Sequence, residues 1–258
     1  MINVMSLQYQ NEAAENEVPA AEDENVNRAQ PILPIYSIIL IACLVVVSLC
    51  QFAVDGAGSI LFGGEKSILL AGFVKPAFAD GQYWRILTGA VLHGGLIHLA
   101  FNCYALYVLG KLIETLSNRA HLTIIFLLSA IGGGILSFIF FPAGISVGAS
   151  GGIVGFLGYL AAYGFIRRKL LPASFLKNML FNIGFIALYG VMLNQTIDNF
   201  GHLGGLLTGA IYGFIQIPKD LYKDPREAGN VAQISGLAAL GIFIAVCGFS
   251  ILLIFRIV

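Results

Sequence analysis

Charged residues are scarce in this chain of 258 residues: only 11% are Asp, Glu, Lys or Arg, whereas 58% are hydrophobic. Soluble domains carry about 25% charged residues, because water has to solvate their surface. The 14 acidic and 14 basic residues leave no net charge, so nothing in the composition favours binding to nucleic acid. The composition excludes a disordered chain, a nucleic-acid binder and an ordinary soluble enzyme, and it predicts a multi-pass membrane protein.

The sequence also has little of what metal and redox sites require. Its four cysteines all lie in apolar segments and form no C-x-x-C pair, which is typical of small packing residues. No H-E-x-x-H sequence is present, and the apolar segments hold no pair of aspartates. These absences argue against metal-dependent and aspartyl intramembrane proteases, and we expect no metal and no cofactor.

Residues 1–30 differ in composition from the rest of the chain. Six acidic residues stand here against one basic residue, Arg28, and no hydrophobic periodicity is present. We predict a disordered acidic tail. No basic segment precedes a short apolar stretch, so we expect no cleaved signal peptide.

Seven segments are apolar enough to cross a bilayer, which takes about 20 residues of helix. They are 32–54, 88–111, 120–142, 148–166, 176–194, 201–217 and 233–256. Segments four to six are short and glycine-rich, so we expect them to be buried among neighbours. We predict a six-helix block within 31–217, a charged linker at 218–232 and an additional C-terminal helix within 233–258. The long connection 55–87 is a candidate functional element.

The distribution of Lys and Arg predicts the orientation, because these residues gather on the cytoplasmic side. With the N-terminus inside, the inner side holds ten of the 14 basic residues and the outer side holds four. The cluster Arg167-Arg168-Lys169 is the strongest single indication. We therefore predict a protein of the plasma (inner) membrane with a cytoplasmic N-terminus and a C-terminus outside.

Polar residues inside apolar segments are energetically costly and therefore informative. His98 and Asn102 lie four residues apart, on one face of the second helix, while Ser150 and His202 begin the fourth and sixth. Taken singly, Ser150 reads as a packing residue, the others as interhelical hydrogen-bond partners and Asp198 as a helix cap. In the predicted orientation they share one depth near the outer side. Independent packing roles do not explain that depth, so the set is a candidate catalytic site.

Glycine spacing suggests how two of these residues could meet. One face of the sixth segment carries Gly201, Gly205, Gly209 and Gly213, and the fourth segment carries Gly148, Gly151, Gly155 and Gly158. Such faces allow two helix backbones to approach closely. If these faces meet, Ser150 and His202 come within hydrogen-bond reach, about 2.6–3.2 Å.

Residues 80–215 contain five short motifs in order: Trp84-Arg85, His93-x4-His98-x3-Asn102, Gly110-x3-Glu114, Gly148-Ala149-Ser150-Gly151 and Gly201-His202-x2-Gly205-x3-Gly209. With these motifs the sequence resembles the rhomboid intramembrane serine proteases. Each motif is weak alone, but their order and their placement on helices two, four and six are specific. The resemblance implies an all-α polytopic membrane protein, with a six-helix rhomboid-like bundle and one additional C-terminal transmembrane helix.

The resemblance also implies an activity and a role for each matching residue. The expected activity is hydrolysis of peptide bonds in or near the outer ends of transmembrane segments of single-span substrate proteins, within the lipid bilayer. Ser150 would be the nucleophile and His202 the general base of a Ser–His dyad, so Asp198 would not be needed as a third member. His98, Asn102 and the Ser150 backbone N–H would form the oxyanion hole. The structural motif residues would be Trp84, Arg85, Glu114, Gly148, Gly205 and Gly209.

Two further features bear on these expectations. The family often has an aromatic residue four positions after the serine, stacked on the histidine ring, but here that position is Val154. Two alternatives follow: His202 is held less firmly, or another aromatic residue such as Phe156 substitutes. The family also implies a substrate gate at the fifth helix and the loop at 194–199.

Two other kinds of function remain open at this point. A non-enzymatic membrane protein could bind or escort client helices with the same cleft. A transporter or channel could place a polar site near its outer side, although such proteins favour charged residues in mid-span and internal repeats, which this sequence does not show.

Overall fold

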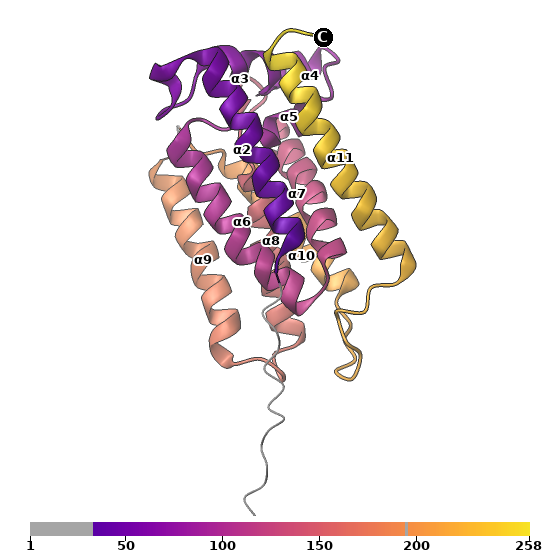
Figure 1. Ribbon diagram of the computed structural model, residues 1–258. Helices are drawn as coiled ribbons and strands as arrows, with labels where there is room; N and C mark the ends of the chain where they lie inside the picture. Colours follow the sequence, from indigo (N-terminus) through magenta and orange to yellow (C-terminus); the bar gives the residue numbers. More distant parts are fainter. Residues whose placement is uncertain (1–32, 194–195) are drawn as a thin grey trace, which may run out of the picture. The chain divides into compact units, whose positions relative to one another are not determined.

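The computed structural model describes residues 33–193 and 196–258, and most of them are helical (Figure 1). Seven long helices occur in the described part of the chain, one for each predicted apolar segment. They are α2 (Ile35–Asp55), α6 (Leu96–Leu116), α7 (Arg119–Phe140), α8 (Ser150–Ile166), α9 (Ala173–Met192), α10 (Asn199–Gln216) and α11 (Asn230–Ile254). The prediction of an all-α bundle is confirmed. The predicted acidic tail, and residues 194–195 of the predicted gate loop, lie outside the described residues.

The connection between α2 and α6 contains most of the short elements. They are η1 (Ala57–Ser59), α3 (Glu65–Ala71), β1 (Phe73–Val74), α4 (Lys75–Ala79), α5 (Arg85–Thr88) and η2 (Gly89–Val91). Strand β2 (Ile145–Ser146), just before α8, pairs antiparallel with β1, with Phe73 opposite Ser146 and Val74 opposite Ile145. The long connection is thereby joined directly to the segment that leads into Ser150.

The predicted boundaries of the second and seventh helices need correction. The second was expected at 88–111, but α6 begins at Leu96 and continues to Leu116. Gly95 has a φ of +101°, which a helix cannot accommodate, and an added Cβ there would overlap the Leu61 carbonyl. Residues before Gly95 therefore form the turn η2 and an extended segment. The last helix begins at Asn230 rather than 233, which shortens the linker.

Five of the described helices are long and apolar enough to cross a membrane: α2, α6, α7, α9 and α11. Helix α8 is apolar but shorter, with 17 residues, and 12 of these are buried. Helix α10 packs mainly against α7 and α8. The expectation that segments four to six are buried holds for α8 but is wrong for α9, where only Met179 and Gly190 are buried.

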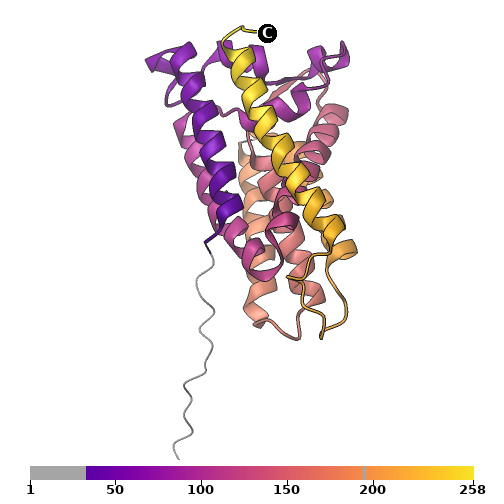
Figure 2. The ribbon, with the colours of Figure 1, turned by 45° about the vertical axis from the view of Figure 1, so that its right-hand side comes forward.

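Successive long helices run in alternating directions (Figures 1 and 2). Residues 56–95 lie at one end of the bundle, together with the C-terminus, and this is called the loop end below. The segments 167–172 and 217–229 lie at the opposite end, called the linker end. Because α8 and α10 both run from the loop end to the linker end, Ser150 and His202 are both placed near the loop end.

Helix α11 packs against α7 and α2. Phe243 meets Phe126 of α7 edge to face at 5.3 Å between ring centroids, and the Thr123 hydroxyl donates to the Gly236 carbonyl at 2.8 Å. Gly236 permits this approach, since an added Cβ would lie 2.5 Å from the Cα atom of Ala120. The seventh helix therefore shares a core with the other six.

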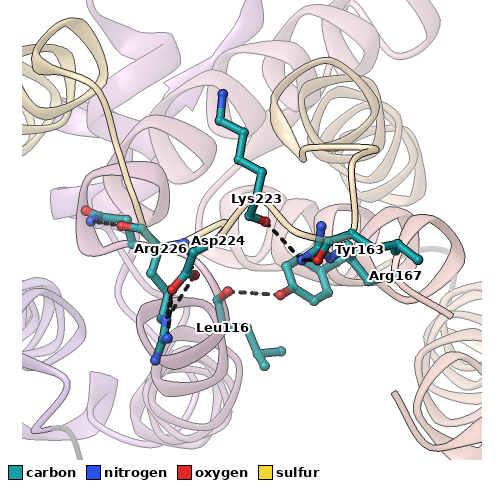
Figure 3. Close-up of polar contacts among 8 residues, drawn as sticks. Leu116, Tyr163, Arg167, Lys223, Asp224 and Arg226 are labelled. Atoms are coloured by element: carbon teal, nitrogen blue, oxygen red, sulfur yellow. Dashed lines mark hydrogen bonds and ion pairs between the residues drawn. The ribbon is translucent and has the colours of Figure 1, made fainter. Parts of the chain in front are cut away.

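Buried polar groups fasten the linker end. Arg167, only 4% exposed, donates to four carbonyls of the linker: those of Pro218, Asp220, Leu221 and Lys223, at 2.6–3.3 Å. Figure 3 shows its contact with Lys223 and, beside it, the ion pair between Arg226 and Asp224. The linker that leads to α11 is therefore wrapped around the last turn of α8.

Glu114 performs a similar role between α6 and α2. Its carboxylate accepts hydrogen bonds from the backbone N–H of Ser37 at 2.9 Å and from the Ser37 hydroxyl at 2.7 Å. It thus satisfies free N–H groups at the start of α2, where a negative charge is favoured. Gly110, one turn earlier, lets Ser37 approach, because an added Cβ would overlap its hydroxyl. Gly110 and Glu114 together join the two helices.

Candidate active site

The first residue of α8 and the fourth residue of α10 form the centre of the site. The Nε2 atom of His202 lies 2.8 Å from the Oγ atom of Ser150, which is hydrogen-bond distance. The other ring nitrogen, Nδ1, is buried and has no protein partner among the described residues. The structure therefore brings together the two side chains that the sequence singled out, with no carboxylate bonded to the histidine.

Two facing rows of glycine allow this approach. A Cβ added to Gly205 would overlap the Gly151 carbonyl, and one added to Gly209 would overlap the Gly155 carbonyl. The predicted meeting of the α8 and α10 glycine faces is confirmed. A second glycine contact was not predicted: a Cβ on Gly204 would lie 2.5 Å from the Gly132 carbonyl oxygen of α7. Backbone contact on both sides fixes α10 and hence the position of His202.

The backbone before Ser150 lies against His98 and Asn102. Gly148 has a φ of +124°, and an added Cβ there would lie 2.8 Å from His98 Nε2 and 3.7 Å from Asn102 Nδ2. The Gly148 N–H donates to the Gly89 carbonyl at 2.9 Å. Glycine is required here by both its conformation and its close neighbours.

The two polar residues of α6 differ in how they are held. His98 Nδ1 accepts a hydrogen bond from the Gly94 N–H at 3.3 Å, which orients the ring. Asn102 is only 5% exposed, and its Nδ2 donor has no partner among the described residues. A buried amide without a partner is unusual and is found where a ligand or water completes the site. His93, by contrast, is fully buried, and its backbone N–H donates to Gln51 of α2 at 2.9 Å.

A small cavity of about 50 Å³ opens beside the Ser–His pair. Its wall is formed mostly by small residues, with polar atoms from Ser150, His202 and Asp198. The small residues include Ala90, Ala130, Gly133, Gly134, Gly151 and Gly152. The wall combines α7, α8, α10 and the end of the long connection.

Trp84 and Arg85 lie in the long connection and hold it together. The Arg85 guanidinium donates to the Gly72 carbonyl at 2.8 Å and lies 4.6 Å from the centre of the Trp84 ring. Trp84 meets Phe249 of α11 edge to face at 5.5 Å between centroids. No pattern in the sequence predicts this contact with the seventh helix.

Asp198 occupies the cap position predicted for it. One carboxylate oxygen, Oδ1, accepts from the Gly201 N–H at 2.8 Å at the start of α10. The other oxygen, Oδ2, accepts from the hydroxyls of Ser137 and Ser146. It also lies 3.8 Å from the ammonium group of Lys75. The sequence does not predict the burial of Lys75, since a lone lysine in a loop is usually exposed.

Burial and pairing shift the acid–base properties of these two loop groups. Burial lowers the pKa of the Lys75 ammonium group, and the Asp198 carboxylate opposes that change. Burial also disfavours the charged form of Asp198, but hydrogen bonds and Lys75 outweigh it and hold the pKa of the carboxyl group below its ordinary value. The lowered pKa favours the ionised form of the Asp198 carboxyl group, which faces the Lys75 ammonium group.

Of the two alternatives for His202, the structure does not support stacking by Phe156. Phe156 is fully buried and packs against Phe126 of α7, with ring centroids 6.1 Å apart. It lies two residues beyond Val154, so the helix turns it toward α7. Within the part of the chain that the structure describes, no aromatic ring stacks on His202.

This fold and this site together define a multi-pass membrane protein with a Ser–His pair between two helices. The model of the Rhomboid domain matches residues 80–219, more than half of the chain. The chain belongs to the rhomboid family, and its apolar helices make it a multi-pass integral membrane protein.

Relatives come from bacteria, plants and a parasite. The chain is 37% identical over 154 residues to "Rhomboid protease GluP" of Bacillus subtilis, covering 58% of this chain and 28% of that protein. It is 36% identical over 163 residues to "RHOMBOID-like protein 6, mitochondrial" of Arabidopsis thaliana, covering 60% and 52%. It is 34% identical over 149 residues to "Rhomboid-like protease 3" of Toxoplasma gondii, covering 56% of each chain. The matches thus span 28–56% of these relatives' own length.

Proposed function

We propose that this protein is an intramembrane serine endopeptidase. It would hydrolyse peptide bonds in or near the outer ends of transmembrane segments of single-span proteins. The observation that carries the proposal is the 2.8 Å contact between Ser150 Oγ and His202 Nε2. Membership of a family whose relatives are named as proteases supports it.

Each proposed role follows from what the side chain can do. A serine hydroxyl is a weak nucleophile near neutral pH, so an adjacent base has to take its proton. His202 accepts that proton through Nε2 while Ser150 Oγ bonds to the substrate carbonyl carbon. His202 then returns the proton to the leaving amine. Water, deprotonated by His202, cleaves the resulting acyl-enzyme and restores Ser150.

The negative oxygen formed during attack needs hydrogen-bond donors. The Ser150 backbone N–H, His98 and Asn102 are proposed to supply them. The Asn102 Nδ2 donor is buried without a partner in the described residues, which suits a group that waits for the oxyanion. A donor of this kind contributes about 3–4 kcal/mol to transition-state stabilisation.

A helical substrate cannot be attacked while its carbonyls are hydrogen-bonded within the helix. We propose that cleavage occurs where small or helix-breaking residues loosen the substrate helix. Helix α9, with only two buried residues, is the least packed of the long helices described and suits a gate for lateral entry. The loop end would face the outside, with the N-terminus in the cytoplasm, in a plasma (inner) membrane.

The test uses purified full-length protein in liposomes with a single-span reporter protein. We expect cleavage by the wild type and none by Ser150→Ala or His202→Ala. Ser235→Ala is the matched control, because Ser235 is exposed and lies in α11, away from the proposed gate. Full cleavage by Ser150→Ala would refute the proposal, and binding of the reporter without cleavage by the wild type would favour the escort alternative.

A further inference from the structure

A charged side chain is completely buried close to the Ser–His pair. Lys75 has no exposed area, and its Nζ atom lies 3.8 Å from Asp198 Oδ2 and 4.7 Å from the centre of the Phe141 ring. Nζ makes no hydrogen bond within the described residues. The aromatic face and the carboxylate are its electrostatic partners.

Burying a charged side chain costs free energy, so the position of Lys75 needs a physical explanation. A buried ion pair is weak support for stability, because both charges lose their hydration. Its best-attested use is to fix which segments meet and in which register. The relevant question is therefore which segments this pair joins.

The pair joins the segments that precede both reacting residues. Asp198 lies four residues before His202, and Ser146, which donates to Asp198 Oδ2 at 2.5 Å, lies four residues before Ser150. Lys75 follows strand β1, which pairs with the strand that contains Ser146, and its backbone N–H donates to the Gly144 carbonyl at 3.2 Å. Lys75, Asp198 and Ser146 therefore close a ring of contacts across the loop end.

We propose that Lys75 is a positioning residue for the proposed dyad: its ion pair with Asp198 holds the long connection, through β1, against the joint that Asp198 and Ser146 form between the starts of α10 and α8, and thereby keeps the Ser150–His202 contact in place. The proposal rests on the proposed protease function. Lys75 does not touch the reacting atoms and acts only through Asp198.

The hydrogen bonds of Asp198 cannot replace the attraction between its carboxylate and the charge on Lys75. Asp198 keeps its cap on Gly201 and its serine donors without Lys75, so it would stay attached to α10 and to the segment before α8. What would be lost is the attraction that draws the long connection, through β1, onto this joint. The expected defect is a change in geometry rather than unfolding.

The experiment compares Lys75→Met, Lys75→Arg, Asp198→Asn and the double variant Lys75→Met/Asp198→Asn in the full-length protein. The control is Lys66→Met, an exposed lysine of the same connection. Active protein is counted by titration with a fluorophosphonate probe, and kcat and KM for a single-span reporter are then measured per titrated site. Thermal unfolding is recorded for each variant.

We expect Lys75→Met to lower kcat about tenfold per titrated site with little change in KM, since small displacements of reacting groups act on catalysis. Lys75→Arg should recover most of the loss, and Lys66→Met should stay within about twofold of the wild type. The double variant should lose no more than the worse single variant, because the two residues act as one pair.

Two results would overturn the inference. An unchanged kcat for Lys75→Met, with or without a lower melting temperature, would make the pair merely structural. Independent, multiplying losses in the double variant would mean that the residues do not act together. If Lys75→Met does not fold, Lys75→Arg and Asp198→Asn decide the question. Because arginine keeps the positive charge, a loss of kcat in Lys75→Arg as large as that in Asp198→Asn would contradict the inference. Absence of probe labelling in the wild type would instead refute the protease function.

Discussion

Replacement of Gly205 by alanine should impair the proposed active site without altering either reacting side chain. Gly205 lies three residues after His202 and faces Gly151, the residue that follows Ser150. An added Cβ would overlap the Gly151 carbonyl oxygen and lie 2.9 Å from its carbon, where ordinary contact is 3.4–4 Å. Both neighbours are backbone atoms, so the helices themselves have to separate.

The size of that separation gives the expected effect. The contact with the carbonyl carbon alone requires 0.5 Å (3.4 minus 2.9), and the oxygen requires more. A movement on the order of 1 Å would stretch the Ser150–His202 hydrogen bond well beyond its normal range, and misplacement by that amount costs about 100-fold in rate. Overpacking should lower the free energy of unfolding by about 1–3 kcal/mol, offset in part by about 1 kcal/mol from the helix propensity of alanine.

The assay is kcat/KM for a single-span reporter in liposomes, with thermal unfolding measured on the same preparations. Gly248→Ala is the matched control, because Gly248 lies within α11 and an added Cβ there would meet nothing within 4 Å. The control should cleave within about twofold of the wild type. If Gly205→Ala folds and cleaves equally well, the glycine contact does not determine the geometry of the Ser–His pair.

Three further predictions concern other joints of the bundle. Glu114→Gln should lower the free energy of unfolding by about 1–3 kcal/mol in thermal or denaturant melts, because a charged cap of α2 is lost, whereas the exposed Glu65→Gln should change it by less than about 0.5 kcal/mol. Arg167→Met should release the linker and speed its cleavage by chymotrypsin, while Arg168→Met, at an exposed neighbour, should not. Equal cleavage rates in the two variants would contradict the role of Arg167 in holding the linker. Asp198→Asn should lower kcat about tenfold, since it weakens a joint; a loss near 10⁴-fold would indicate a true triad.

The helices could be predicted from the sequence because hydrophobicity over about 20 residues is a local property. The α8–α10 contact could also be predicted, since glycine faces leave few other ways to pack. The start of α6 was missed because the apolar run continues through Gly94 and Gly95, and only the positive φ of Gly95 ends the helix. The exposure of α9 was missed because a glycine-rich segment does not reveal whether a neighbour covers it.

The polar residues at the site were identifiable because they interrupt apolar helices. Lys75 was not, because it lies in a loop and its partner Asp198 is 123 positions away (198 minus 75). The contact of Trp84 with Phe249 was hidden for the same reason. Long-range pairs of this kind depend on how the long connection folds back over the bundle, and no local pattern in the sequence carries that information.

The central claim is that Ser150 is a nucleophile activated by His202, and covalent labelling tests it most directly. Purified protein in liposomes is treated with a fluorophosphonate probe, and the modified residue is mapped by peptide mass spectrometry. We predict a single adduct on Ser150 in the wild type, retained in Lys66→Met and lost in His202→Ala. Labelling elsewhere, or undiminished labelling of Ser150 in His202→Ala, would contradict the account.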